Sequence, residues 1–226
     1  IAFLQYTSGS TGDPKGVVLT HANLLANLRA MGPAFKVTSE DVFVSWLPLY
    51  HDMGLIGAWF GSLYFAMPLV LMSPLAFLAR PARWLQAISR HRGTLTAAPN
   101  FAYALATERI RDEEMEGIDL SPWRFALCGA ETVVPEVLRA FAERFARWGF
   151  RPQALKPVYG LSEAALAVTF ADLERPFLAV HFDRTALVER GEAVAVAMPS
   201  MPPSGDQARE IVSVGRPLEG FGLELR

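Results

Sequence analysis

The stretch Tyr6-Thr-Ser-Gly-Ser-Thr-Gly-Asp-Pro-Lys-Gly16 decides how this chain is interpreted. It follows the apolar run Ile1–Leu4 and places hydroxyls, three glycines and one lysine in a single turn. Such a turn can point backbone N–H groups and hydroxyls at a phosphate, and Lys15 adds a compact positive charge. A nucleotide triphosphate is the ligand that this pattern indicates. The alternative is a flexible surface loop whose glycines serve only turns.

The residues on either side of Lys15 argue against an ordinary P-loop NTPase. Pro14 precedes the lysine and Gly16 follows it. A Walker A loop instead has glycine before the lysine and serine or threonine after it. The sequence therefore predicts a phosphate-binding loop of another type.

A second cluster, Lys156-Pro-Val-Tyr-Gly-Leu-Ser-Glu163, complements this loop. Tyr159 can stack on a base, Ser162 can donate to a phosphoryl oxygen, and Glu163 can hold Mg²⁺ through its carboxylate. Taken singly, Tyr159 would be a core aromatic and Glu163 a solvated acid. Together with the loop, the two clusters predict the two halves of an ATP site.

Four motifs in this chain resemble those of the adenylate-forming (AMP-binding) superfamily, and they occur in that family's order. They are the loop Tyr6–Gly16 with its continuation to Leu24, the block Trp46–Gly57, the turn Cys128–Thr132 and the segment Tyr159–Glu163. The resemblance covers the chain from about residue 3 to residue 165. Within the superfamily the chain is most similar to the fatty acyl-AMP ligases, through Leu47–Ile56, Trp148–Gly160, Val180–Gly191 and Val212–Pro217.

This resemblance implies activation of a fatty acid by ATP, giving an acyl-adenylate and pyrophosphate, followed by transfer to a pantetheine thiol. It also implies roles for individual residues. The phosphates would be held by Thr7, Ser8, Gly9, Ser10, Thr11, Gly12 and Lys15, and the adenine would be bounded by Gly129, Ala130, Glu131, Tyr159 and Gly160. Ser162 would contact the α-phosphate and Glu163 would bind Mg²⁺. His51 would lie beside the acyl carboxylate, or would instead cap a helix that begins near Met53.

The resemblance also implies that residues 1–226 are a partial adenylation core. The leading subdomain, the ribose-binding aspartate and the mobile C-terminal domain with the adenylation lysine would lie outside them. We expect the isolated chain to bind nucleotide weakly and not to turn over. The acceptor would be an acyl carrier protein, with coenzyme A as the alternative, and a non-catalytic adenylate-binding scaffold is the alternative of another class.

Alternating signals along the chain predict an α/β fold, with a layered, mostly parallel sheet flanked by helices and a more irregular, β-rich C-terminal part. Short apolar runs suit buried parallel strands, and amphipathic stripes between them suit helices. The expected strands are 42–46, 69–72, 94–97, 125–128 and 154–158. The expected helices follow Thr20, Arg80 and Pro99 and run from Pro135 to a stop at Gly149. Residues 198–207 read as a loop and Phe221–Arg226 as a strand.

The composition agrees with a globular core in the cytoplasm. The 226 residues are 51% apolar and 19% charged, with a net charge of −2, so nucleic acid is not an expected partner. The single Cys128 is expected to be a small buried residue. Residues 53–79 carry no charge, which is long enough to span a membrane. Pro68, Pro74 and several glycines divide this run, however, and favour a buried helix and strand that could also line an acyl tunnel.

Overall fold

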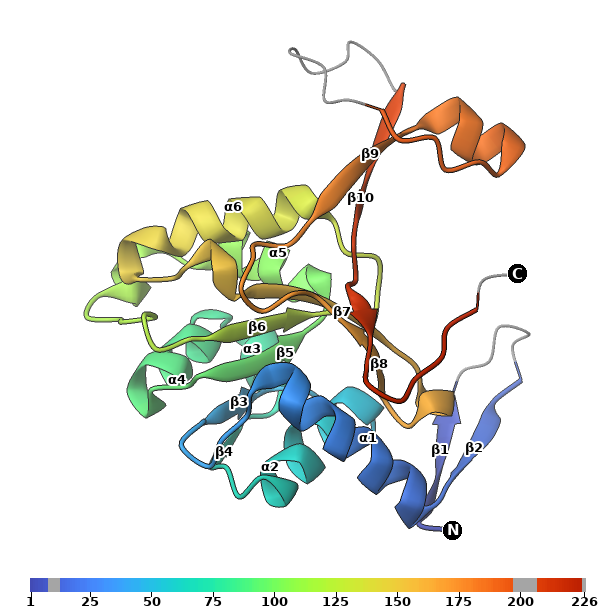
Figure 1. Ribbon diagram of the computed structural model, residues 1–226. Coiled ribbons are helices and arrows are strands. Elements are labelled where there is room, and N and C mark those ends of the chain that lie inside the picture. The colour runs from blue at the N-terminus through green and yellow to red at the C-terminus, as the bar shows by residue number, and fades with distance from the viewer. Residues whose placement is uncertain (8–12, 197–206, 225–226) are drawn as a thin grey trace.

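The computed structural model describes residues 1–7, 13–196 and 207–224, and its centre is a seven-stranded sheet (Figure 1). The strand order is β11-β8-β7-β6-β5-β3-β4. Five strands run parallel: β3 (Phe43–Ser45), β4 (Leu69–Leu71), β5 (Leu95–Ala98), β6 (Phe125–Cys128) and β7 (Leu155–Gly160). Each coincides with an expected apolar run. The predicted α/β class is confirmed, and the antiparallel strands β8 (Ala167–Phe170) and β11 (Arg216–Pro217) extend one edge.

The helices begin and end where the sequence gives physical signals. Helix α1 (His21–Phe35) follows Thr20, whose hydroxyl accepts the N–H of Asn23 at 3.2 Å. Helices α4 (Ala82–His91), α5 (Asn100–Arg109) and α6 (Pro135–Phe145) lie at the other expected positions. A short helix, α3 (Pro74–Ala79), was not expected. Ser73 caps it and Pro74 opens it, which is a recognisable start signal.

Side chains alternate across the central strands and divide the sheet into two faces. Leu95, Ala97 and Leu127 face a cavity that is closed on one side by Met31 and Phe35 of α1. On the opposite face, α4, α5 and α6 contribute a cluster of buried aromatic rings. In this cluster Trp84 packs edge-on against Tyr103 at 5.5 Å and against Trp123 at 5.4 Å between ring centroids. Cys128 is fully buried, as expected, and burial raises the pKa of its thiol.

The uncharged stretch 53–79 folds as four short elements. A π-helix (Met53–Phe60) continues into α2 (Gly61–Tyr64), then come β4 and α3. Pro68 lies before β4 and Pro74 opens α3, so the stretch cannot continue as one helix. Within the parts of the chain that the structure describes, no helix is both long and apolar enough to cross a membrane.

Two small antiparallel sheets flank the central one. β1 (Phe3–Thr7) pairs with β2 (Lys15–Leu19), and β9 (Ala179–Asp183) pairs with β10 (Ala208–Val212). In Figure 1 the β9–β10 hairpin extends beyond α6, away from the central sheet. These strands form the expected β-rich C-terminal part. Residues 221–224, however, form no strand, because no neighbouring segment of the described chain pairs with them.

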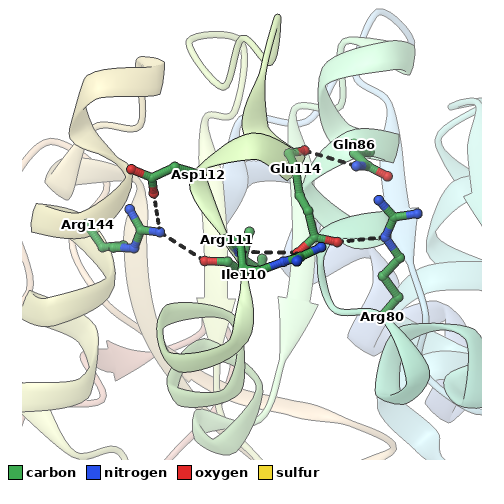
Figure 2. Close-up of polar contacts among 7 residues, drawn as sticks. All are labelled: Arg80, Gln86, Ile110, Arg111, Asp112, Glu114 and Arg144. Atoms are coloured by element: carbon green, nitrogen blue, oxygen red, sulfur yellow. Dashed lines mark hydrogen bonds and ion pairs between the residues drawn. The ribbon is translucent and has the colours of Figure 1, made fainter.

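A polar network joins the connection before α4, the segment after α5, and α6 (Figure 2). Glu114 accepts from Arg80 Nε at 2.8 Å and from the backbone N–H of Arg111 at 3.2 Å. Arg144 donates to the Ile110 carbonyl at 2.9 Å and lies 2.6 Å from Asp112. This network holds the helices to one another, and none of its residues lines the cavity described next.

Candidate active site

A cavity of about 540 Å³ lies between the central sheet, α1, the π-helix and the β1–β2 hairpin. One end is polar and the other is apolar. The polar residues that line it are Thr7, Lys15, His51, Asp52, Tyr159, Ser162 and Glu163. Ligand sites in open α/β sheets lie at the carboxyl ends of strands, and here β7 carries Tyr159 directly into the polar end. The fold thus brings the two clusters from the sequence, separated by more than a hundred residues, to one cavity.

The β1–β2 hairpin places Thr7 and Lys15 opposite each other, because they form the register pair next to its connecting loop. Lys15 was expected inside the turn, whereas it is the first residue of β2. Ser8, Gly9, Ser10, Thr11 and Gly12 lie outside the described residues. Strand pairing therefore fixes the base of the predicted phosphate loop and directs the lysine to the same cavity as Glu163.

A second hollow, of about 390 Å³, adjoins this polar end. It is lined by Ala130, Glu131, Tyr159 and Gly160, four of the residues predicted to bound the adenine, and by part of β10. Tyr159 is 48% exposed and lines both hollows, so its aromatic ring can stack on a ligand there. Ala130 has a positive φ of 69°, and the Gly129 N–H bonds the Ala98 carbonyl at 3.4 Å. Ala130, Glu131, Tyr159 and Gly160 thus form a wall next to the predicted phosphate loop.

The Glu131 carboxylate already has a partner. Its Oε1 accepts the backbone N–H of Phe101 at 2.7 Å, at the start of α5. This bond caps a helix whose N-cap residue, Pro99, offers no side-chain acceptor. Glu131 therefore forms part of the wall while its carboxylate points to the helix end.

Gly160 is required by the close approach of two strands. A Cβ at this position would lie 2.0 Å from the backbone carbonyl oxygen of Leu166. The β7–β8 register also shifts between Tyr159 and Gly160. This irregularity ends β7 and starts the short helical turn Ser162–Ala164, which carries Ser162 and Glu163 toward the cavity.

Asp52 is a site residue that the sequence reasoning missed. It is nearly buried, and its Oδ2 accepts the Ser162 hydroxyl at 2.5 Å. Its Oδ1 lies 2.8 Å from His51 Nδ1 and 2.7 Å from the Met53 N–H. The signal was present in the sequence, because an acid next to His51 in an otherwise uncharged stretch needs a polar partner.

His51 and Asp52 shift each other's pKa values. The hydrogen bond that His51 donates to Asp52 raises the pKa of His51, and it outweighs the opposing effect of burial. Burial of Asp52 disfavours its charged form, but hydrogen bonds from His51, Ser162 and Met53 together lower the pKa of its carboxyl. Coupled shifts of this kind in a cavity are typical of functional sites. The helix-capping alternative for His51 is secondary, because Asp52 is the nearer acceptor for Met53 N–H.

The far end of the cavity is apolar. Met31 and Phe35 of α1, Met67 before β4, and Phe170 of β8 line it. Gly57 and Gly61 of the helical segment face the same space, which leaves it unfilled by side chains. An apolar pocket that opens from a charged mouth suits a ligand with a polar head and a hydrocarbon tail.

The sequence matches the AMP-binding enzyme family over residues 1–220. A medium-chain-fatty-acid–[acyl-carrier-protein] ligase, TtuA of Teredinibacter turnerae, is 42% identical over 197 residues, covering 87% of this chain and 30% of the relative. The corresponding ligase JamA of Moorena producens is 42% identical over all 226 residues, which cover 37% of its length. The chain thus spans about a third of the length of these curated relatives.

Solved structures give the same result. One from a study of fatty acyl-adenylate ligases of E. coli and L. pneumophila has a TM-score of 0.93 and 40% identity, covering all of this chain and 40% of its own. The L. pneumophila ligase in complex with acyl adenylate and pyrophosphate has a TM-score of 0.88 and 39% identity, covering 96% of this chain and 37% of its own. Since the family match extends over nearly the whole chain, the protein belongs to the AMP-binding enzyme family.

Proposed function

We propose that this chain is part of the adenylation core of a longer enzyme that activates a fatty acid with ATP to form an acyl-adenylate. One observation carries the proposal: a single cavity joins a cationic, hydroxyl-bearing mouth to an apolar interior. A site for nucleotide alone would need no apolar extension, and a fatty-acid carrier would need no carboxylate at the mouth. The similarity to ligases that act on fatty acids supports the same reaction.

In this reaction the fatty carboxylate attacks the α-phosphorus of ATP and pyrophosphate leaves. The reacting groups are both anionic, so the site must neutralise charge and hold them in line. Lys15 and Thr7 would bind the outer phosphates, together with the loop residues 8–12. Tyr159 would stack on the adenine and Ser162 would donate to the α-phosphate.

The exposed carboxylate of Glu163 fits a role as a magnesium ligand. Mg²⁺ is usually held by one or two carboxylates together with substrate phosphates, so a single acidic side chain at the cavity mouth suffices. When bound, the ion would offset the negative charge of the phosphates. His51, whose pKa is raised by its hydrogen bond to Asp52, would lie beside the fatty carboxylate.

The acceptor of the acyl group is proposed to be an acyl carrier protein. Two relatives carry that acceptor in their names. The segment from about residue 181 to residue 207 is proposed to hinder the pose that favours coenzyme A. The β9–β10 hairpin contains the described part of it, and Arg139 of α6 holds this hairpin through a two-point ion pair with Glu210. Deletion of the segment from the full-length protein should raise the yield of acyl-coenzyme A, and an unchanged yield would contradict this role.

The proposed reaction is tested with the full-length protein, ATP, Mg²⁺ and a series of fatty acids from four to eighteen carbons. Fatty-acid-dependent release of pyrophosphate is the expected result, and Lys15→Ala should lower kcat/KM about a hundredfold. The matched control is Glu114→Gln, which alters a carboxylate outside the cavity and should keep full activity. Nucleotide binding without pyrophosphate release for any acid would instead identify a scaffold module. Parallel assays with coenzyme A and with holo-acyl carrier protein would identify the acceptor.

A further inference from the structure

Asp52 connects two parts of the site that lie 110 residues apart in the sequence. Its Oδ1 contacts His51 in the turn before the π-helix, and its Oδ2 accepts the hydroxyl of Ser162 in the helical turn after β7. Only 12% of the side chain is exposed, so bulk water does not compete strongly for these bonds. A nearly buried carboxylate that holds two cavity-lining side chains does more than cap the π-helix.

The hydrogen-bond geometry selects which nitrogen of His51 carries the proton. Nδ1 lies within reach of two groups, the Asp52 carboxylate at 2.8 Å and the Met53 N–H at 3.2 Å. A ring nitrogen cannot donate to the first and accept from the second at the same time. The Met53 N–H has a nearer acceptor, Asp52 Oδ1 at 2.7 Å, so Nδ1–H donates to Asp52. The other nitrogen, Nε2, is then left for a ligand.

We propose that Asp52 is a positioning residue that holds His51 with Nδ1 protonated and aligns the imidazole with the Ser162 hydroxyl at the mouth of the cavity. This inference rests on the proposed function, because it assigns His51 to the fatty carboxylate and Ser162 to the nucleotide. Asp52 itself is assigned no contact with either substrate. It sets the geometry between His51 and Ser162, the two groups assigned to the substrates. The acid of a catalytic triad orients its histidine in the same way.

The bond to Ser162 has a consequence for substrate binding. The hydroxyl has one proton, which it donates to Asp52 in this structure. When that proton turns to a phosphate oxygen, Asp52 keeps only His51 and Met53 as donors. Nucleotide binding at Ser162 should therefore change the hydrogen bond between Asp52 and His51.

The first test is the tautomer of His51, measured by ¹⁵N NMR on the full-length wild-type protein. A His51→Gln variant of the same protein identifies the signals of His51 among those of the other histidines. The expected result is a protonated Nδ1 both in the neutral and in the cationic form of the ring. A neutral ring protonated at Nε2 would overturn the proposal. This measurement needs no activity, so it stands even if the enzyme releases no pyrophosphate and the proposed function fails.

The second test compares Asp52→Asn with Asp52→Glu, which keeps the charge but moves it by one methylene. Both should lower kcat for pyrophosphate release by about ten- to a hundredfold, as supporting residues around a site typically do. The double variant Asp52→Asn/His51→Gln should be no worse than the more damaging single variant, because the two residues act as a unit. Glu114→Gln is the matched control and should leave kcat unchanged. If both Asp52 variants retain wild-type kcat, the proposal is wrong, and if neither folds, the wild-type tautomer decides.

Discussion

Asp52 and Glu114 are two carboxylates with the same exposure and different surroundings. Each side chain is 12% exposed, and each has a lowered pKa. Glu114 contacts the guanidinium groups of Arg80 and Arg111, which stay charged at every physiological pH. Asp52 contacts a histidine that titrates and a hydroxyl that can change partner. Burial alone therefore does not identify a functional acid, whereas partners that can change state do.

The position of each carboxylate agrees with this distinction. The Glu114 network joins helices and lines neither hollow, while Asp52 lines the cavity.

The largest effect is expected from a methyl group at Gly160. In Gly160→Ala the new Cβ would lie 2.0 Å from a backbone oxygen, so the β7–β8 pairing must move. We expect the free energy of unfolding to fall by about 3 kcal/mol, as for severe overpacking. Gly117→Ala, near Glu114, is the control: it has φ +70° and open space around it, so about 1 kcal/mol of backbone strain is expected. Equal losses in denaturant titrations would show that the site region is not the more tightly packed one.

A side chain at Gly57 should change which acids are used. Its Cβ would lie 3.0 Å from Leu166 Cδ2, so Gly57→Leu would fill the apolar end of the cavity. We expect kcat/KM for the longest accepted fatty acid to fall about tenfold, equivalent to about 1.4 kcal/mol. The shortest accepted acid serves as the internal control and should lose little. A uniform loss across chain lengths would place the acyl chain elsewhere.

Neutralising Glu114 should affect stability and leave catalysis unchanged. Glu114→Gln removes a charge from partly exposed ion pairs, which contribute little in water. The free energy of unfolding should fall by about 0.5 kcal/mol, with kcat and KM unchanged. Thermal melts and steady-state kinetics on the same preparation check this. A fall in kcat would mean that the Glu114 network influences the geometry of the active site.

The smallest expected effect is a difference in pH dependence. The raised pKa of His51 means that its bond to Asp52 stabilises the fold fully below about pH 6.5, and that this contribution is lost as the pH rises through the folded-state pKa. The lowered pKa of Asp52 makes its own contribution present above about pH 4 and lost as the pH falls through its folded-state pKa. The stability that Asp52→Asn removes should thus be greatest between about pH 4 and 6.5.

Glu114 should behave differently above neutral pH. Its pKa is lowered by the backbone N–H of Arg111 and by Arg80, so its contribution is lost only as the pH falls. Urea titrations of wild type, Asp52→Asn and Glu114→Gln at pH 5.5 and pH 8.5 compare the two. A Glu114 contribution that declined at pH 8.5, or an Asp52 contribution that did not, would contradict the assignment of partners.

The sequence was sufficient for most of the fold because the signals were local. Five apolar runs became the five parallel strands. The Thr20 cap began α1, and Pro135 in the first turn began α6. The expected strand at 221–226 is wrong over residues 221–224, since a strand needs a neighbour that the sequence cannot supply. Lys15, in contrast, was expected in the turn but lies in a strand, because it pairs with Thr7 of β1.

The sequence by itself determined the residue types of the site: hydroxyls and Lys15 in one segment, Tyr159, Ser162 and Glu163 in another. Motif spacing along the chain carries this information, because a phosphate, a base and a metal each need particular side chains. Only the tertiary structure decided that these segments share one cavity with an apolar interior, and that Asp52 bonds both His51 and Ser162. Contacts across 110 residues depend on how strands and helices pack, and no local pattern encodes them.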